Sequence, residues 1–432
     1  MGARIVITCW GSYGDVYPYL GLALALKARG HSPVLATAAY YRSAIEREGI
    51  AFHPVRPDLD PGDTAIIKRV MDPAHGTQFL IEDLLMAPLA EAYADLDRAA
   101  PGADLLITHP VTFAGRLVAD KRGLTWAASV LAPMSFFSLT DLPIFPRWPL
   151  LAHIGRLGPW ASRALMGRAR VVTREWTAPV AALRGHLGLH PAGDPLYEGQ
   201  FSPHLNLALF SRVLAEPQAD WPPNTHVTGF VPYNGPDRLP AALAEFLGRG
   251  DPPVVFTLGS SAVGAAGAFY EESAKAAAAL GVRAVLLIGA NPMNRPKKPL
   301  PADIMAIEHA PHQELFPHAA AIVHQCGIGT AGQALRPGQP QLLVPHAHDQ
   351  PDNAFRIRRL GVARQLTPKQ YRAARVQADL RALLSDARYA ARAREVALTV
   401  KAERGPEGAC LAIEELLGRA RPHPAESAEL LR

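Results

Sequence analysis

The residues best suited to ligand chemistry lie between Ala321 and Asn353, in the sequence AIVHQCGIGTAGQALRPGQPQLLVPHAHDQPDN. An apolar strand predicted over Ala319 to Val323 leads into a loop that carries Gly327 and Gly329, and a helical pattern follows. A strand that gives way to small residues and then to a helix directs free N–H groups and the positive helix end at one point. Such a corner suits a phosphate.

A polar pair follows the next apolar strand of the same stretch. Asp349 and Gln350 come directly after His346-Ala347-His348. A carboxylate beside an amide can both accept and donate hydrogen bonds, which suits the hydroxyl groups of a sugar. The stretch therefore predicts a ligand with phosphate at one end and hydroxyl groups at the other.

Two further candidates follow predicted strands in the first half of the chain. Asp15 closes the turn GSYGD after the strand Arg4 to Cys9. An aspartate ahead of an apolar helix is commonly its N-cap, and the residues alone favour that role over a general base. His109 ends the strand Asp104 to Thr108, where a histidine either satisfies local hydrogen bonds or takes part in chemistry.

The elements that must position these residues alternate between strand and helix. The first half opens with the strand Arg4 to Cys9, the helix Tyr19 to Arg29 and the strand Pro33 to Thr37; Pro253 to Leu258 begins a similar series after a Pro-rich stretch. We expect an α/β fold of two doubly wound parallel sheets whose ligands bind at the carboxyl ends of the strands. The predicted parts are a first domain 1–215, a linker 216–240, a second domain 241–410 and a C-terminal helix and tail 411–432.

Composition narrows the class of protein. The chain has 432 residues, 49% of them hydrophobic, and a net charge of +5, which is mild for this length and gives no reason to expect a nucleic-acid partner. Cys9, Cys326 and Cys410 lie far apart and make no zinc pattern. The cysteine pattern indicates a reduced, cytoplasmic compartment. No apolar run of about 20 residues is present, so we expect no membrane-spanning segment.

Two short motifs suggest other chemistry. Gly327 to Gly332 reads as G-x-G-x-x-G, which raises the alternative of a nicotinamide-dependent oxidoreductase, but three residues separate it from its strand and it falls late in its domain. Asp58 and Asp60 form a D-x-D that could hold a metal, and Asp95 and Asp97 repeat it within a predicted helix. Solvated acids are the favoured interpretation, and we expect no metal site.

The stretch Leu142 to Trp176 interleaves aromatic residues with arginines. One interpretation is a helical cover of the first domain with arginines whose stems lie along apolar surface. The other is an apolar acceptor pocket or a surface that rests on anionic lipid at the inner face of the membrane.

Four segments together resemble a known family. They are WGSYGDVYPYLGLALALKARGH, VVFTLGSS, HQCGIGTAGQAL and GQPQLLVPHAHDQPDNA. In this order, and across nearly the whole chain, they resemble the two-domain nucleotide-sugar glycosyltransferases that include the macrolide, sterol and plant secondary-product sugar transferases. The run PHAHDQPDNA is most similar to the rhamnosyltransferase of rhamnolipid assembly.

The resemblance implies an inverting, metal-independent transfer of a hexose or deoxyhexose from a UDP- or dTDP-sugar to a hydroxyl of an apolar acceptor. It implies two facing domains, with the last helix crossing back onto the first. It places Asp15 as the base, with His109 near it or near the acceptor. Donor contacts are implied for Ser12, Ser260, His312, Gln313, His324, Gln325, Gly327, Ile328, Gly329, Thr330, Asp349 and Gln350, and acceptor contacts for Tyr13, Phe136, Phe145 and Trp148.

The sequence departs from the resembled pattern at Gln325. Many of the resembled proteins carry a phosphate-binding histidine there, whereas here only His324 remains before it. The diphosphate contact is therefore altered, which favours dTDP-sugar branches. A catalytically silent protein that binds a sugar nucleotide stays open as a further alternative, although Asp15 and Asp349 argue against it.

Overall fold

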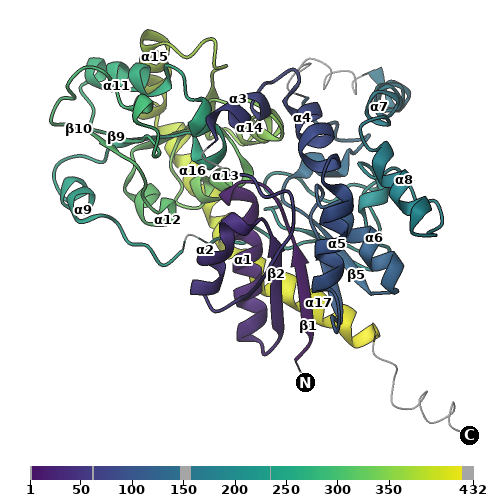
Figure 1. The fold of residues 1–432 in the computed structure, drawn as a ribbon. Helices are drawn as coiled ribbons and strands as arrows, with labels where there is room; N and C mark the ends of the chain where they lie inside the picture. The colour runs from purple at the N-terminus through teal and green to yellow at the C-terminus, as the bar shows by residue number, and fades with distance from the viewer. Residues whose placement is uncertain (1, 61–62, 146–156, 234, 421–432) are drawn as a thin grey trace, which may run out of the picture.

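The computed structural model describes residues 2–60, 63–145, 157–233 and 235–420, and contains two parallel β-sheets covered by helices (Figure 1). The seven-stranded sheet has the order β3-β2-β1-β4-β5-β6-β7 and the six-stranded sheet the order β10-β9-β8-β11-β12-β13. All pairings within both sheets are parallel. The predicted fold class is confirmed.

The strands of the first sheet are short and their central members are covered on both faces. In β1, Ile5, Val6 and Ile7 are all fully buried, as expected for a β-branched run between neighbours in a parallel sheet. The strands are β1 Arg4–Thr8, β2 Ser32–Thr37, β3 Ala51–Pro54, β4 Leu105–Thr108, β5 Trp126–Val130, β6 Asn206–Ala208 and β7 Thr225–Val227.

The strands of the second sheet are β8 Val254–Thr257, β9 Ala284–Leu287, β10 Ile304–Ile307, β11 Ala321–His324, β12 Gln341–Leu343 and β13 Ala363–Gln365. β11 pairs with β8 on one side and β12 on the other, so the loop after it opens at the middle of the sheet edge. This central place is where ligands bind in open α/β sheets.

Helices cover both sheets. Those of the first half are α1 Tyr13–Ala28, α2 Arg42–Arg47, α3 Thr64–Val70, α4 Gly76–Phe79, α5 Leu89–Ala99, α6 Ala114–Arg122, α7 Pro159–Thr173 and α8 Ala178–His186. Those of the second are α9 Ala241–Leu247, α10 Gly259–Ala262, α11 Phe269–Leu280, α12 His312–Leu315, α13 Ile328–Leu335, α14 Gln350–Arg359, α15 Ala373–Ser385, α16 Ala387–Ala402 and α17 Gly405–Ala420.

Some predicted boundaries differ from the structure. The first helix begins at Tyr13 and not at Tyr19, because Ser12 caps it and Pro18 is accommodated inside it. The segment 216–240, predicted as a linker, contains β7, which pairs with β6 at the edge of the first sheet. The first sheet therefore extends to Val227.

The two halves are tied together by charged side chains at their interface. Arg356 of α14 donates to Asp352 (2.7 Å) and pairs with Asp141 of the first half, and Asp352 also accepts from the backbone N–H of Ile144 (3.0 Å). Arg356 and Asp352 are almost fully buried. Removing one partner of such a group leaves a buried charge, which typically costs about 3–5 kcal/mol.

The last helix returns to the first half. Arg29, which follows α1, donates two hydrogen bonds to Glu414 of α17 (2.7 and 2.6 Å). Figure 1 shows α17 alongside α1 and below the first sheet. Among the described residues, no helix combines the length and the apolar composition needed to cross a bilayer.

Candidate active site

The first corner of the site is the turn from β1 into α1. The Ser12 N–H and hydroxyl both donate to Oδ2 of Asp15, at 2.8 and 3.0 Å. Ser12 is the N-cap and Asp15 the third helical residue. The carboxylate folds back over Gly11, where a Cβ would lie 2.4 Å from Oδ2, so only glycine fits that position. Asp15 is thus held as a partner of the cap and is not the cap itself.

The surroundings of Asp15 suit it to accept a proton. Its side chain is half-buried at the first corner. Burial raises its pKa, although the hydrogen bonds from Ser12 act in the opposite direction. A carboxylate with a raised pKa is a stronger base, and Asp15 can therefore take a proton from a hydroxyl that reaches it.

The second corner is the turn from β11 into α13. Cys326 takes a left-handed backbone (φ 69°) and Gly327 is the N-cap. No acidic residue lies in the first turn of α13. The positive end of this helix therefore lacks an anion from its own sequence, as a phosphate site requires.

His324 and Gln325 point to different sides of this corner. The His324 ring is fully buried, with Nε2 bonded to Oε1 of Gln341 (2.9 Å) and Nδ1 accepting from the Cys326 N–H (3.1 Å). Burial lowers its pKa to about 4, so the ring is neutral. These contacts assign His324 to holding the loop, which differs from the donor contact predicted for it.

Gln325 faces the turn after β8. Its Nε2 donates to Oγ1 of Thr330 (3.3 Å), and a Cβ on Gly259 would lie 2.2 Å from that nitrogen. Its Oε1 is buried and has no hydrogen-bond partner among the described residues. Ser260 follows Gly259 in α10, so the structure brings the predicted residues Gln325, Thr330 and Ser260 to one place.

Asp349 stands beside the second corner, just before α14. Nδ2 of Asn353, a fully buried residue, donates both to Oδ2 of Asp349 (2.7 Å) and to the carbonyl of Cys326 (2.9 Å). Burial, and then the charge of Asp15, raise the pKa of Asp349 to about 7, against the effect of the Asn353 amide and the Ile328 N–H. Asp349 is thus close to both corners.

The neighbouring Gln350 has a structural role through its amide oxygen. This oxygen accepts from the N–H groups of His346 (2.9 Å) and Ala347 (3.4 Å), and the side chain is 2% exposed. It therefore shapes the loop that carries Asp349.

The two corners meet through glycines. A Cβ on Gly329 would lie 2.9 Å from Cα of Gly14, so the first turns of α1 and α13 touch backbone to backbone. Side chains of Asp15 and Asp349 flank this contact. The structure thereby brings together predicted residues that lie more than 300 positions apart in the sequence.

His109 makes local contacts. Its Nδ1 accepts from the Val111 N–H (3.4 Å) and its ring meets that of Tyr19 edge to face, while no hydrogen bond links it to Asp15 among the described residues. Burial lowers its pKa to about 3, so it is neutral. A role in orienting Asp15 has no support from these contacts.

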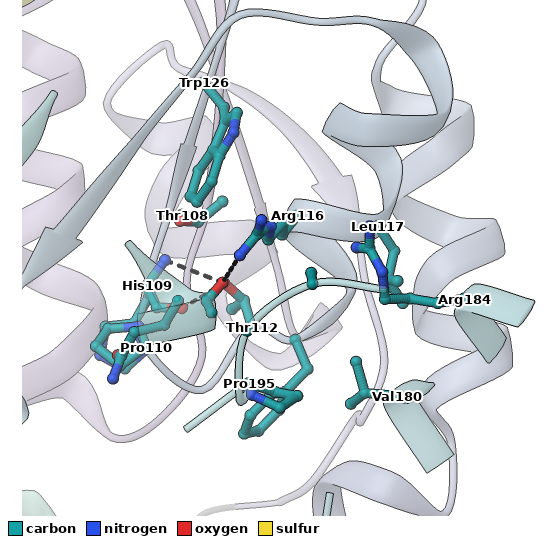
Figure 2. A pocket seen from close by; sticks show the side chains of 15 residues that line it. Thr108, His109, Pro110, Thr112, Arg116, Leu117, Trp126, Val180, Arg184 and Pro195 are labelled. Atoms are coloured by element: carbon teal, nitrogen blue, oxygen red, sulfur yellow. Dashed lines mark hydrogen bonds between the residues drawn. The ribbon is translucent and has the colours of Figure 1, made fainter. Parts of the chain in front are cut away.

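His109 instead lines a small pocket, part of it open to solvent, between α6, α8 and the loop before β6 (Figure 2). Arg116 donates to the carbonyl of Gly199 at the wall (2.7 Å), and Oε1 of Gln200 is buried without a partner among the described residues. Arg116 and Gln200 were not predicted from the sequence. The amphipathic helix after His109 was the signal that could have indicated Arg116.

The predicted acceptor residues divide into three groups. Tyr13 donates to the hydroxyl of Tyr40 (3.2 Å) within a ring cluster at the first corner. Phe136 is 6% exposed and stacks on Trp221 (4.2 Å), so it belongs to the core. Phe145 packs partly buried on a small cluster near α7, and Trp148 lies outside the described residues.

His312 and Gln313 open α12, next to the second sheet. The His312 ring stacks on Phe316 (4.4 Å), and burial lowers its pKa to about 3. A neutral, partly exposed ring and the adjacent amide form a surface of the kind that a nucleobase can stack on or bond to.

No metal centre is apparent in the part of the chain that the structure describes, where no three His, Cys, Asp or Glu side chains converge. In the second of the two D-x-D motifs, the aspartates are not the solvated acids that we expected. Asp95 is buried and paired with Arg56 (2.8 Å), and Asp97 is paired with Arg122.

Comparison with known proteins identifies both halves of the chain. Residues 5–91 match the family described as glycosyltransferase family 28 N-terminal domain, and residues 274–416 match the erythromycin biosynthesis protein CIII-like C-terminal domain. The chain is 34% identical to O-mycaminosyltylonolide 6-deoxyallosyltransferase of Streptomyces fradiae, over 95% of this chain and 97% of that protein.

Other relatives are more distant. The chain is 27% identical to 4'-demethylrebeccamycin synthase of Lentzea aerocolonigenes, over 90% and 93% of the two chains. It is 28% identical to a sterol 3-beta-glucosyltransferase of Leptosphaeria maculans, of which it spans 30%. Among solved structures, spinosyn forosaminyltransferase SpnP superimposes with a TM-score of 0.70 at 21% identity, covering 97% of this chain and all of that one. Glycosyltransferase VinC in complex with dTDP gives 0.66 at 23% identity, with 96% and 100% covered. At these identities the solved structures establish a common fold.

Proposed function

Since the chain belongs to the family of nucleotide-sugar glycosyltransferases that includes the macrolide and sterol sugar transferases, we propose the reaction that this enzyme catalyses. A hexose or deoxyhexose moves from a UDP- or dTDP-sugar to a hydroxyl of an apolar acceptor, with inversion and without a metal. The observation that carries the proposal is the contact between the two corners at Gly14 and Gly329. This contact supports the proposal because it lies between Asp15, the proposed base of one half, and the N-terminus of α13 in the other half, the proposed phosphate site.

In the proposed mechanism, Asp15 accepts the proton of the acceptor hydroxyl. The acceptor oxygen attacks the anomeric carbon, and the bond from that carbon to the diphosphate oxygen breaks on the opposite face. Negative charge then develops on the diphosphate, where it is stabilised by the positive end of α13 and by the hydroxyl of Thr330. The raised pKa of Asp15 supports the first step.

Asp349 is proposed to bind hydroxyls of the donor sugar. Its place beside both corners supports this role, and the Asn353 amide fixes one of its oxygens. With a pKa of about 7, the group is available both as a hydrogen-bond donor and as an acceptor near neutral pH.

A deoxysugar donor and a polycyclic or macrocyclic acceptor are the substrates we favour. The support comes from the relative named as a 6-deoxyallosyltransferase of O-mycaminosyltylonolide and from the solved relative with dTDP. The resemblance of the PHAHDQPDNA segment to a rhamnolipid transferase keeps a lipid hydroxy acid as the second acceptor class.

A thermal-shift panel of UDP, dTDP, their sugars and NADH, followed by mass spectrometry of products with macrolides, sterols, phenolics and hydroxy acids, tests the proposal. We expect stabilisation by one nucleoside diphosphate and a product heavier by one sugar residue. Stabilisation by NADH alone would support the oxidoreductase alternative, and donor binding without turnover on any acceptor would support the silent protein.

A further inference from the structure

Helix α7 carries an unusual surface for a helix at the outside of a domain. Of nine large hydrophobic residues that are exposed in the described part of the chain, four lie on α7 or just before it. They are Leu157 (65% exposed), Trp160 (67%), Val171 (67%) and Val172 (48%). Figure 1 shows α7 at the outer edge of the first half, away from the second sheet.

The exposed residues follow the period of the helix. Trp160, Ala164, Gly167 and Val171 are spaced by four, three and four residues, so they form one stripe, and all are exposed. The opposite face of α7 is the one that packs on the domain, through Ala161, Ser162 and Met166. The helix is therefore apolar on both its inner and its outer side.

Arginines border the outer stripe. Helical spacing places Arg163 and Arg174 along one side and Arg168 along the other, and all three are exposed. Within the described residues, Arg163 and Arg168 make no ion pair, whereas Arg170 pairs with Glu198 (2.7 Å). No acidic residue occurs in α7.

We propose that this outer stripe with Arg163, Arg168 and Arg174, here called the α7 face, docks on an anionic lipid surface. A tryptophan and small apolar residues enter the boundary between headgroups and acyl chains, and the flanking arginines contact the phosphates. The inference is independent of the proposed function.

The dimensions and charge of the α7 face decide against other occupants. A stripe on this 15-residue helix is about 22 Å long and about 10 Å wide. That area is far below the roughly 800 Å² per partner of a stable protein interface. A second copy related by two-fold symmetry would also bring arginines against arginines. A flat anionic surface meets neither objection.

Sedimentation with vesicles tests the inference on the whole protein. Binding to vesicles of equal parts phosphatidylcholine and phosphatidylglycerol should exceed binding to phosphatidylcholine alone, and should weaken between about 0.05 and about 0.5 M salt as charges are screened. The double variant R163E/R168E should reduce binding by about thirtyfold or more, because each arginine near such a surface contributes a factor of about five. Trp160→Ser should weaken binding severalfold and leave its salt dependence in place.

The matched control is R381E/R394E, which reverses two exposed arginines of α15 and α16 that also make no ion pair in the described structure. We expect this variant to bind like the wild type. Equal binding to both vesicle types, no binding to either, or an equal loss in the control would each overturn the inference. Self-association that Trp160→Ser abolishes would assign the face to a second copy and would overturn it too.

Discussion

The two corners that meet at Gly14 and Gly329 are both turns from a strand into a helix. They differ in the source of the negative charge near the positive end of that helix. In the first, Asp15 lies within the first turn of α1 and accepts from Ser12. In the second, α13 has no acid in its first turn, and the nearest carboxylate, Asp349, comes from another element. At the first corner the anion belongs to the helix itself, whereas at the second a carboxylate from another element lies near the helix end.

This difference shows how one local structure can serve two roles. An anion near a helix N-terminus contributes about 0.3–1 kcal/mol when exposed and more when partly buried. In α1 that interaction is intramolecular and fixes the orientation of a carboxylate. In the proposed mechanism, the N-terminus of α13 makes the same interaction with the diphosphate, and the interaction grows as negative charge develops on the leaving group.

The largest effect is expected from removing the proton acceptor at the first corner. Asp15→Asn keeps an oxygen that can accept from Ser12, so the helix start should survive. The rate constant for transfer should fall by about 10²–10⁴, the usual contribution of a general base. Donor affinity, measured by calorimetry, should stay the same.

Asp63→Asn is the control for that variant, because Asp63 caps α3 and accepts from the N–H groups of Ala65 and Ile66. It should leave turnover unchanged. If Asp15→Asn transferred sugar at nearly the wild-type rate, the first corner would be a cap and nothing more.

An anion built into the second corner should compete with the ligand. Gln325→Glu keeps the shape of the side chain, and its carboxylate can accept from the hydroxyl of Thr330, to which the Gln325 amide now donates. We expect the KM for the donor to rise about tenfold to hundredfold, as when a hydrogen bond to a charged group is lost. Binding of the unphosphorylated nucleoside, measured in parallel, should not change. Equal losses for the nucleoside and the diphosphate would place the phosphates elsewhere.

A smaller effect, on the pH dependence of stability, is expected from Asp349, which lies close to both corners. Folded Asp349 keeps its proton up to about pH 7, whereas an unfolded aspartate loses it near about pH 3.9. Between these values the folded chain binds more protons, so this group lowers the free energy of unfolding as the pH rises. Asp349→Asn removes that dependence, and its Tm relative to the wild type should increase from about pH 4 to about pH 7.

Buried histidines raise the free energy of unfolding as the pH rises, which is the opposite of the effect of Asp349. The reason is that burial lowers the pKa values of His109, His312, His324 and His348. Their contribution is the same in both proteins and cancels in the comparison of Tm values. Parallel Tm curves for the variant and the wild type would mean that Asp349 ionises normally.

The smallest effect is expected from chelation. Transfer in EDTA should match transfer without it, because neither corner offers a set of carboxylates to a metal among the described residues. Asp58→Asn should behave like the wild type. Loss of activity that magnesium or manganese restores would contradict the metal-independent mechanism.

The sequence indicated the backbone of both corners better than the direction of their side chains. Buried runs such as Ile5 to Ile7 identify central strands because both faces of a parallel sheet are covered. His324 and Gln325 are adjacent, and side chains alternate at a strand end, so only one of them can face the ligand. Donor contacts had been predicted for both residues.

Other features depended on tertiary packing. The stacking of Phe136 on Trp221 joins segments far apart in the chain, and no local pattern indicates it. β7 is only three residues long and lies in a Pro-rich stretch, so its composition resembled a linker. The absence of a hydrogen bond from His109 to Asp15 among the described residues follows from side-chain directions that spacing does not encode.

The bare backbones of Gly14 and Gly329 have a consequence for the design of variants. In the proposed mechanism, this contact fixes how far Asp15 lies from the N-terminus of α13, and with it the distance from the attacking oxygen to the sugar carbon. A displacement of about 1 Å in such a geometry can cost a factor of about 10² in rate. Variants designed to accept other acceptors should therefore change the residues that line the acceptor pocket and keep Gly14 and Gly329. A methyl group added at Gly329 would push the two helix ends apart.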